Sequence, residues 1–472
     1  MARVMLVQPW NYHDEGLAGQ DVAQQWRNGP YSLVLLATQL RQHGHDVAIV
    51  DMIRDLIVAD GHVDAILAKL QSEVVAFRPD ILGFGFFSIH YLETIRAVEA
   101  ARAACRLAGL STVFVAGGIH ASTEPELTLK TMGFDLAFLG EADVSLLRFA
   151  ETGDARSIPG IVSADRLTGD LGPKQEVLDD LPFPDWSLVD YRFYAQPSRG
   201  KIKTRYTSSL DLIMGRGCVY KCTFCAYPTL SSVRFHSAEY LVEQVGYMYR
   251  AFGVDSVYFT DSTIGNNRKL IVRFSELMIA RGLSDRVEWH ANIRPNQVNE
   301  ELLRLMWRAG CRFLFYGFES GSQRVLDLMA KGCKTGDNVR AAALHEQLGF
   351  PYHASMLLGF PGETEDDVQA TLAFMRQCAS PSMGVNWYVP LPGSPDYDRL
   401  KGAGVLDVDD PRLWRQIGEV NGSRVYADVE EGRFRELFAE AERIAYQDLP
   451  TRQRGLWGCL APPHAGMTLA DA

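Results

Sequence analysis

Short apolar segments alternate with helix-length stretches along most of this chain, and the alternation limits the folds that it can adopt. Within the first 150 residues the strand candidates are segments 4–7, 47–50, 81–84, 112–115 and 136–139. Each is followed by turn residues or by a helical stretch, the pattern of strands joined by crossover helices. The pattern predicts an α/β fold that begins with a doubly wound, Rossmann-like parallel sheet over residues 1–150.

The loops after three of these strands are rich in small and polar residues. Ligands bind beyond the C-terminal strand ends of such sheets, and a glycine pair lets the backbone approach a ligand closely. The residues concerned are Phe86, Ser88, Ile89, Gly117, Gly118, Ile119, His120, Gly140 and Glu141. We predict a ligand site there, with ordinary tight turns as the alternative. The segment has no GxGxxG sequence, so a dinucleotide site is not predicted.

A second βα series begins near residue 210. Its strand candidates are segments 210–214, 257–260, 287–290, 313–316, 353–357 and 385–388. Six parallel strands with crossover helices predict a partial (β/α)6 TIM-like barrel over residues 206–400, with its chemistry at the C-terminal mouth. Residues 151–205, dense in proline and acid near 179–186, are predicted as a linker. Residues 401–472 are predicted as a small helical region with a frayed tail.

The composition excludes several classes of protein. The formal net charge is −11, which disfavours a nucleic acid as the main partner. The sequence has no run of about 18 uncharged apolar residues, so no membrane span is predicted. Eight cysteines in 472 residues, three of them close together, indicate a reducing, cytoplasmic compartment and a metal site rather than a disulfide framework.

The three clustered cysteines lie directly after the first strand of the second series. Cys218, Cys222 and Cys225 fall in residues 215–228, GRGCVYKCTFCAYP, with C-x3-C-x2-C spacing. Thiolates select zinc, copper(I) or iron–sulfur clusters. A structural zinc normally has four ligands, and no partner follows at finger spacing. Three thiolates would leave one iron of a [4Fe–4S] cluster open to a substrate or cofactor.

This loop, with Phe224 before the third cysteine, resembles the signature of the radical S-adenosylmethionine (SAM) enzymes. The resemblance implies a [4Fe–4S] cluster whose open iron binds SAM, and reductive cleavage of SAM to a 5′-deoxyadenosyl radical. The later stretches FTDS, NIR and GFES are similar to SAM-site elements of the family, and GFPGE is similar to one of its turns. The SAM-binding residues implied are Phe224, Thr260, Asp261, Ser262, Asn292, Arg294, Glu319 and Ser320.

The first 150 residues resemble the cobalamin (B12)-binding domain of B12-dependent radical SAM enzymes of the methyltransferase type. The resemblance is carried by residues 44–51, 79–83, 117–121 and 140–141. It implies that the residues listed above for the ligand site, from Phe86 to Glu141, bind cobalamin. The sequence contains no DxHxxG, so no histidine is offered as the usual lower ligand of cobalt. The resemblance to this subfamily implies a base-off cobalamin. His90 and His120 are interpreted as polar loop residues.

The resemblance implies methylation of an unactivated carbon, or of phosphorus, in a small molecule of secondary metabolism. It also implies a low-potential electron donor, a flavodoxin or a ferredoxin. One alternative keeps both cofactors for oxidative cyclisation or ring rearrangement. A tRNA-modifying methylthiotransferase is a further alternative, but that enzyme needs three more cluster cysteines ahead of the barrel, where only Cys105 lies.

The remaining cysteines and two aromatic residues have no assigned chemistry. Cys311, Cys333, Cys378 and Cys459 are interpreted as scattered core or surface thiols. Trp387 and Tyr388, at the last strand of the barrel, are expected either to line the substrate pocket or to pack in the core. The sequence does not define the substrate or a catalytic acid or base.

Overall fold

The structure is a computed structural model that describes residues 1–11, 29–195, 209–226, 232–378, 380, 382–418 and 424–447. Cys459 and the predicted tail lie outside the described residues. The chain divides into two compact units. The first comprises Met1–Lys201, Cys225–Arg234 and Pro390–Glu419, and the second comprises Ile202–Phe224, Phe235–Val389 and Val420–Ala472.

The first unit is built on a six-stranded sheet with the order β2-β1-β3-β4-β5-β6. Its strands are β1 (Arg3–Gln8), β2 (Asp46–Asp51), β3 (Ile81–Gly85), β4 (Val113–Gly117), β5 (Leu136–Phe138) and β6 (Ile161–Val162). Strands β1 to β5 pair in parallel, and the short β6 pairs antiparallel with β5. The doubly wound sheet is confirmed. The strand order reverses at β1 and β3, where such a sheet opens a crevice at its C-terminal edge.

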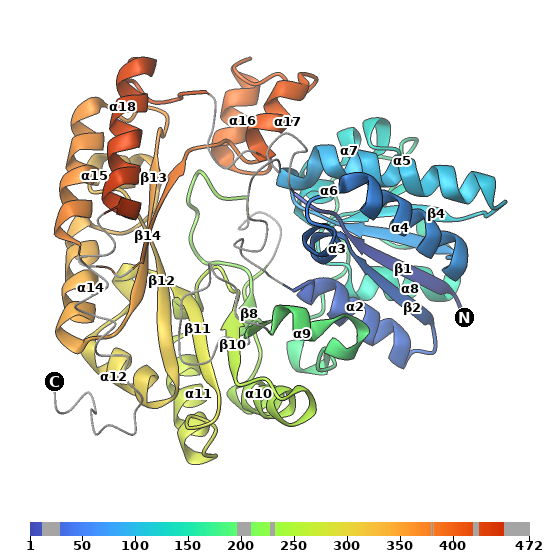
Figure 1. The fold of residues 1–472 in the computed structure, drawn as a ribbon, viewed down its shortest axis with the longest axis horizontal. Coiled ribbons are helices and arrows are strands. Elements are labelled where there is room, and N and C mark those ends of the chain that lie inside the picture. Colours follow the sequence, from blue (N-terminus) through green and yellow to red (C-terminus); the bar gives the residue numbers. More distant parts are fainter. Residues whose placement is uncertain are drawn as a thin grey trace. The chain divides into compact units, whose positions relative to one another are not determined.

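Helices cover both faces of this sheet (Figure 1). Helices α2 (Tyr31–Gln42) and α8 (Asp143–Thr152) lie on one face, and α4 (Val63–Phe77) and α5 (Tyr91–Leu107) lie on the other. Leu33, Ala37 and Leu40 of α2 pack against Val4 and Leu6 of β1. Their spacing along α2 puts them on one helical face, which is why the segment folds as a helix against the sheet. The shorter helices are α3 (Met52–Val58), α6 (Ile119–Thr123) and α7 (Pro125–Thr131).

The described part of the predicted linker packs on the first unit. It contains β6, 3-10 turns at Ala155–Ser157, Leu178–Asp180 and Trp186–Leu188, and α9 (Tyr191–Tyr194). Leu178 and Leu181 pack against Leu35 of α2, and the Trp186 side chain is fully buried. Apolar residues spaced between prolines and acids therefore anchor a segment whose overall composition is typical of a linker.

The second unit is built on a six-stranded, all-parallel sheet with the order β14-β13-β12-β11-β10-β7. Its strands are β7 (Ser209–Leu212), β10 (Ser256–Phe259), β11 (Glu288–Ile293), β12 (Cys311–Glu319), β13 (Tyr352–Leu358) and β14 (Ser382–Trp387). The edge strands are β7 and β14, so the predicted partial barrel is confirmed. Two-residue strands β8 (Gly215–Arg216) and β9 (Arg234–Phe235) precede and follow the cysteine loop.

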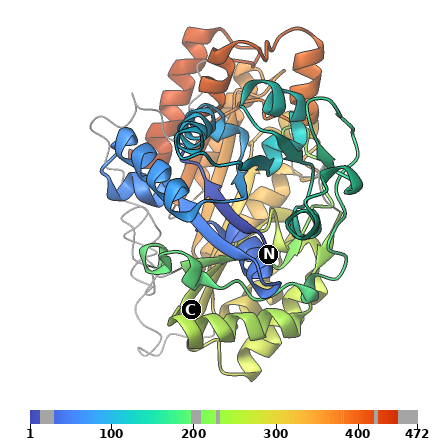
Figure 2. The same cartoon turned by 90° about the vertical axis from the view of Figure 1, so that its right-hand side faces the viewer.

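Helices line one side of this second sheet. They are α10 (Ala238–Phe252), α11 (Arg268–Ala280), α12 (Glu300–Arg308), α14 (Thr335–Leu348), α15 (Glu365–Gln377) and α18 (Glu431–Glu442). The short α13 (Gln323–Leu328) follows β12. Figure 2 shows α10 and α11, in light green and yellow-green, running side by side. Side chains on this side are buried: the rings of Phe259, Phe274 and Trp289 meet with centroid distances of 5.5 to 5.9 Å.

The opposite side of the second sheet carries half-buried residues at alternate positions. Tyr258, Phe315 and His353 lie there on three different strands, with ring centroids 5.3 and 5.7 Å apart along the row. Because the sheet is parallel, all of its strands end at the same edge, and the loop that follows β7 starts at that edge.

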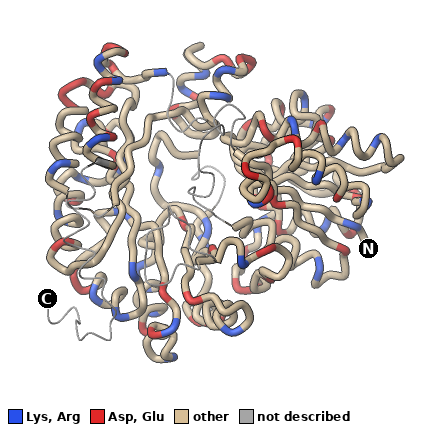
Figure 3. Tube along the Cα trace, viewed as in Figure 1, with Lys and Arg blue, Asp and Glu red and all other residues tan. Residues whose placement is uncertain are grey.

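Charged residues are spread over the outer helices of each unit, with both signs interspersed along the described chain (Figure 3). None of the described helices combines the length and the apolar character that crossing a membrane requires. Two further helices, α16 (Pro395–Gly402) and α17 (Pro411–Gly418), belong to the first unit.

Candidate functional site

The cysteine loop follows β7 and β8, and its residues up to Phe224 are held by main-chain and side-chain contacts within the second unit. Cys222 is buried, and Cys218 and Cys225 are half-buried. The backbone N–H of Thr223 donates to the carbonyl of Met329 at 2.9 Å. Such a bond fixes the middle of the loop against the segment after α13.

The start of the loop is fixed by Asp261, which lies directly after β10. Its two carboxylate oxygens accept hydrogen bonds from the backbone N–H groups of Met214 and Gly215, both at 2.8 Å. Burial raises the pKa of this carboxyl to about 7, and the two N–H groups act in the opposite direction. The Asn292 amide donates to the Asp261 carbonyl at 2.8 Å. Asp261 thus supports the strand end from which the cysteine loop starts.

Two other residues predicted to bind SAM lie beside Asp261. The Thr260 hydroxyl donates to the Leu212 carbonyl at 3.2 Å, and Ser262 is exposed. The side-chain carbonyl of Asn292 accepts from the Tyr258 hydroxyl at 2.9 Å. The structure therefore brings Thr260, Asp261, Ser262 and Asn292 together at the ends of neighbouring strands, and their contact with SAM stays a prediction.

Arg294, which follows β11, is buried against the cysteine loop. Its guanidinium lies 3.5 Å from the Sγ atom of Cys222 and 3.4 Å from that of Cys333, and it donates to the Lys331 carbonyl. The Cζ atom is 3.6 Å from the centroid of the Tyr220 ring. Sequence reasoning did not assign Lys331 or Cys333 to this site, because the segment KGC carries no recognisable motif.

Glu319 ends β12 in a strained conformation beside Lys331. Its φ is +63°, and the pairing register with β13 shifts between Gly317 and Glu319. The carboxylate pairs with the Lys331 ammonium at 2.7 Å, and both side chains are largely buried. A Cβ added to Gly317 would lie 2.2 Å from a Glu319 carboxylate oxygen, so a larger residue there would require the carboxylate to shift. A left-handed glutamate at a strand end is typical of functional positions.

The other two residues predicted to bind SAM near this strand end differ in accessibility. The Phe224 ring is half-buried and its centroid lies 5.8 Å from the Lys331 ammonium. Ser320 is fully buried, and its hydroxyl lies 3.0 Å from that of Thr371. Those contacts give Ser320 a structural role in holding α15 to the end of β12.

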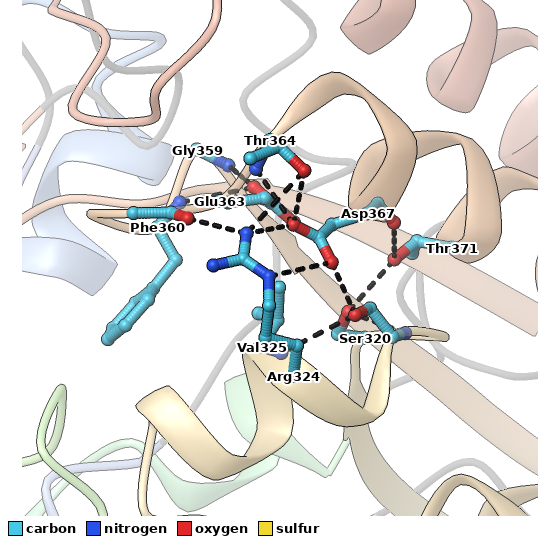
Figure 4. Close-up of polar contacts among 11 residues, drawn as sticks. Ser320, Arg324, Val325, Gly359, Phe360, Glu363, Thr364, Asp367 and Thr371 are labelled. Atoms are coloured by element: carbon cyan, nitrogen blue, oxygen red, sulfur yellow. Dashed lines mark hydrogen bonds and ion pairs between the residues drawn. The ribbon is translucent and has the colours of Figure 1, made fainter.

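The GFPGE turn is closed by its own glutamate. The Glu363 carboxylate accepts hydrogen bonds from the backbone N–H groups of Gly359 and Phe360 at 2.6 and 3.2 Å (Figure 4). Its other oxygen has no hydrogen-bond partner among the described residues. Burial raises the pKa of Glu363 to about 8, against the effect of the two N–H groups.

The carboxylate of Asp367, also beside this turn, has a lowered pKa, in contrast to that of Glu363. Burial acts to raise the pKa of Asp367, but the ion pair with Arg324 and hydrogen bonds from Ser322 and Thr364 hold that pKa well below its ordinary value. Figure 4 shows both carboxylates at the start of α15, with the Arg324 guanidinium between the turn and the helix.

We predict that replacing Glu363 by glutamine removes a pH dependence of stability. The folded pKa, about 8, is above the ordinary value of 4.5, so folding retains a proton that the unfolded chain releases. The free energy of unfolding therefore falls as pH rises from about 4.5 to about 8. Glu363→Gln mimics the protonated acid and is expected to be more stable than the unsubstituted protein by about 2 kcal/mol or more at pH 8.5, and about equal at pH 4.5.

Urea unfolding at several pH values measures this difference. Glu365→Gln, at a half-exposed carboxylate that begins α15 and pairs with Arg433 at 2.8 Å, is the control and is expected to leave the slope of stability against pH unchanged in this window. Parallel pH curves for Glu363→Gln and the unsubstituted protein would contradict the assignment.

In the first unit, the predicted cobalamin residues gather at the C-terminal ends of β3 and β4. Gly118 has a φ of +93°, and a Cβ there would lie 2.6 Å from the Phe86 carbonyl oxygen. His120 is fully buried: its Nδ1 atom lies 2.9 Å from the Ser88 hydroxyl, and its Nε2 atom has no hydrogen-bond partner among the described residues. Burial lowers its pKa to about 3, so the ring is neutral near pH 7.

The other predicted cobalamin residues lie around this turn. Gly117 ends β4, and Ile89 and Ile119 are half-buried in the turns that follow β3 and β4. The Gly140 N–H donates to the Ser122 hydroxyl at 2.9 Å. Glu141 forms a largely buried ion pair with Arg234. The structure thus brings the residues after β3 and β4 together, whereas the Glu141 carboxylate is held by a cation of its own unit.

Helix α17 covers part of this edge, a packing position that the sequence pattern did not predict. Its Trp414 stacks on Tyr91 with a centroid distance of 4.2 Å and meets His120 edge-on at 5.3 Å. The neighbouring α16 is tied to the same unit by an ion pair between Lys401 and Glu124 at 2.9 Å. The residues after the barrel therefore contribute an aromatic cap to the first unit.

The two aromatic residues considered for the substrate pocket are buried. Trp387 packs against Phe434 and Phe438 with centroid distances of 4.7 and 5.0 Å, and Tyr388 packs edge-on against Phe360 at 5.2 Å. Their exposed fractions are 6% and 1%. These contacts favour the core-packing alternative.

The described residues fit the two cofactors that the sequence implies. Three thiols on one loop, with a buried guanidinium against Cys222, suit an anionic iron–sulfur cluster, because the cation offsets its negative charge. At the edge of the first sheet, the bare Gly118 turn and the unpaired nitrogen of His120 suit a bound ligand.

Comparisons with known proteins match both regions of the chain. Residues 212–375 match the radical SAM superfamily, and residues 28–150 match the B12 binding domain. The chain is therefore an α/β protein with a B12-binding domain and a radical SAM domain. The two matches together support a B12-dependent radical SAM enzyme of the methyltransferase type.

Individual relatives are distant. An uncharacterized methyltransferase of Pyrococcus horikoshii is 27% identical over 386 residues, covering 77% of each chain. The anaerobic magnesium-protoporphyrin IX monomethyl ester cyclase of Cereibacter sphaeroides is 26% identical over 422 residues, 84% of this chain and 64% of the cyclase. The radical SAM methyltransferase TsrM from Kitasatospora setae, solved with cobalamin and a [4Fe–4S] cluster, has a similar fold, with a TM-score of 0.64 and 19% identity over 85% of this chain and 75% of TsrM.

Proposed function

We propose that the protein is a cobalamin-dependent methylase that acts on an unactivated carbon, or on phosphorus, of a small molecule. The observation that carries the proposal is a loop with three cysteines at C-x3-C-x2-C spacing. This loop lies at the strand ends of a parallel partial barrel, in a chain that also has a B12-binding domain. When bound, the cluster, SAM and cobalamin supply radical formation and a methyl group that does not need a nucleophilic acceptor.

The chain's own residues bind and orient these groups. Cys218, Cys222 and Cys225 hold the cluster, and Asp261 fixes the strand end before them. Glu319, with its charge balanced by Lys331, is presented at the end of β12 toward SAM. Five further residues complete the proposed SAM site: Phe224, Thr260, Ser262, Asn292 and Ser320. Ser320 contributes indirectly, by holding α15 to the end of β12.

In the first unit, the loops after β3 and β4 hold the cobalamin in the base-off state that the family resemblance implies, with no DxHxxG histidine available as its lower ligand. The neutral, buried His120 and the Gly118 turn form the floor of this site. Reduction of the cluster requires a low-potential donor, a flavodoxin or ferredoxin, and a cytoplasmic location is part of the proposal.

A second candidate is oxidative cyclisation without methyl transfer, favoured by the similarity to the Cereibacter sphaeroides cyclase over 84% of this chain. The cyclase is the longer protein, and its activity is not transferred to this chain by that similarity alone.

Anaerobic incubation with trideuteromethyl-SAM separates the two candidates. The reconstituted protein is mixed with dithionite, methyl viologen, cobalamin and a small-molecule extract, and new products are found by mass spectrometry. Methylation is expected to give products that carry the whole trideuteromethyl group. Products that lose hydrogen and carry no deuterium would overturn the methylase proposal in favour of the cyclase.

A further inference from the structure

Arg294 carries a buried positive charge that is not neutralised by a carboxylate. Its side chain is 7% exposed, and its described partners are the sulfurs of Cys222 and Cys333, the Lys331 carbonyl and the face of Tyr220. In the described part of the chain no aspartate or glutamate contacts the guanidinium. The nearby Lys331 differs, because its ammonium is paired with Glu319 at 2.7 Å.

An unpaired cation at this depth is costly unless something negative shares the site. Burying an ion without a counter-charge destabilises a fold by several kcal/mol in ordinary cases. Arginine cannot lose its proton in a protein, so Arg294 does not escape the cost by titrating. A thiolate-ligated iron–sulfur cluster is negatively charged, and hydrogen bonds to its sulfurs together with nearby charge set its reduction potential.

We propose that Arg294 is a positioning residue that sets the reduction potential of the cluster by donating a hydrogen bond to the Cys222 sulfur. Cys333 and the Lys331 carbonyl anchor the second arm of the guanidinium and so fix its orientation. The inference rests on the proposed cluster at Cys218, Cys222 and Cys225. It replaces direct SAM binding, expected from the sequence, as the role of Arg294, and it gives Cys333 a role that its isolated place in the sequence did not indicate.

A positive charge and a hydrogen bond on a ligand sulfur both stabilise the reduced, more negative cluster. Removing them is therefore expected to make the cluster harder to reduce. Arg294→Met removes the charge and the donors at similar side-chain length. Arg294→Lys keeps the charge but has no planar fork to reach both sulfurs. Cys333→Ala removes only the second anchor.

The test is a potentiometric titration of anaerobically reconstituted protein, followed by electron paramagnetic resonance of the reduced cluster. At the midpoint potential of the unsubstituted protein, Arg294→Met is expected to lower the ratio of reduced to oxidised cluster at least tenfold, equivalent to about 59 mV for a one-electron couple. Arg294→Lys is expected to give a smaller decrease, and Cys333→Ala the smallest. Iron content and circular dichroism are measured for each variant.

Arg312→Met is the matched control. Arg312 lies at the start of β12, is also largely buried, and contacts Glu288 at 3.6 Å rather than the cysteine loop. This variant is expected to keep the original potential. An equal shift in Arg312→Met would show a general effect of lost charge and would overturn the inference.

The outcomes separate this inference from the proposed function. If the unsubstituted protein holds no reducible cluster, the proposed function itself fails. If that protein holds one and Arg294→Met has the same potential, only the role of Arg294 fails, and weaker SAM binding in that variant would return Arg294 to the SAM site. If Arg294→Met folds but does not retain iron, the role of Arg294 is decided by the potentiometric titration of Arg294→Lys. An unchanged potential in Arg294→Lys would overturn the inference.

Discussion

Replacing Cys222 by alanine is expected to abolish iron–sulfur loading and, with it, all turnover of SAM. Cys222 is the buried member of the three cysteines and the one that Arg294 contacts at 3.5 Å. Without it two thiolates remain, too few to hold the cluster with a single open iron. Enzymes accelerate reactions by at least about 10⁶-fold, so loss of the cofactor should leave no detectable activity. Iron and sulfide analysis and assays of SAM products measure both effects.

Cys105→Ala is the control for this substitution. Cys105 is also buried, lies on α5 of the first unit, and contacts only the Thr112 hydroxyl among its described hydrogen-bonding partners, at 3.6 Å. Its removal is expected to leave the iron content unchanged. Full iron loading in Cys222→Ala would contradict the assignment of the cluster to this loop.

Replacing Gly118 by alanine is expected to have the largest effect in the first unit. A Cβ there would lie 2.6 Å from the Phe86 carbonyl oxygen, and the φ of +93° is disfavoured for any other residue. We expect the turn after β4 to lose about 2–4 kcal/mol of stability, the range of strain and overpacking effects. Hydrogen exchange of the β4 amides measures that loss, and corrin absorbance after reconstitution measures cobalamin retention, which should fall at least about tenfold.

Gly109→Ala provides the comparison. Gly109 is also left-handed, with a φ of +61°, but no atom lies within 4 Å of the position that a Cβ would take. This substitution is expected to cost about 1 kcal/mol and to leave cobalamin binding intact. Equal effects of the two substitutions would mean that backbone strain alone, and not the closeness of Phe86, makes glycine necessary at residue 118.

The fold was predictable from sequence because the strands of both sheets are short apolar segments separated by helix-length stretches. All eleven predicted strands are present, within a few residues of their expected bounds. The short β6 was missed, since two residues give no periodicity. The packing of residues 151–195 was missed for a different reason: Leu178 and Trp186 are single anchors in a segment dominated by proline and acid.

The candidate site was predictable where a motif lies on consecutive residues. The cysteine loop and the glycine turn at Gly118 are of this kind. The environment of Arg294 was not predictable, because it combines two segments, residues 220–222 and 331–333, that lie far from Arg294 and from each other in the sequence. Such contacts depend on the tertiary fold and leave no local pattern.

The function of Asp261 shows the same limit. Its position after β10 matches a family element, yet its carboxylate binds the backbone of Met214 and Gly215. Trp414 is a similar case. It stacks on Tyr91, the first residue of α5, although the two residues are more than 300 positions apart in the sequence.

The most direct test of the account is the stoichiometry of iron and the consumption of SAM by the anaerobically reconstituted full-length protein. With dithionite and cobalamin, the account predicts about four irons per chain and SAM-derived 5′-deoxyadenosine or S-adenosylhomocysteine that disappears in the Cys222→Ala variant. A protein that binds zinc in this loop, or that holds the irons and leaves SAM intact under these conditions, would contradict the central claim.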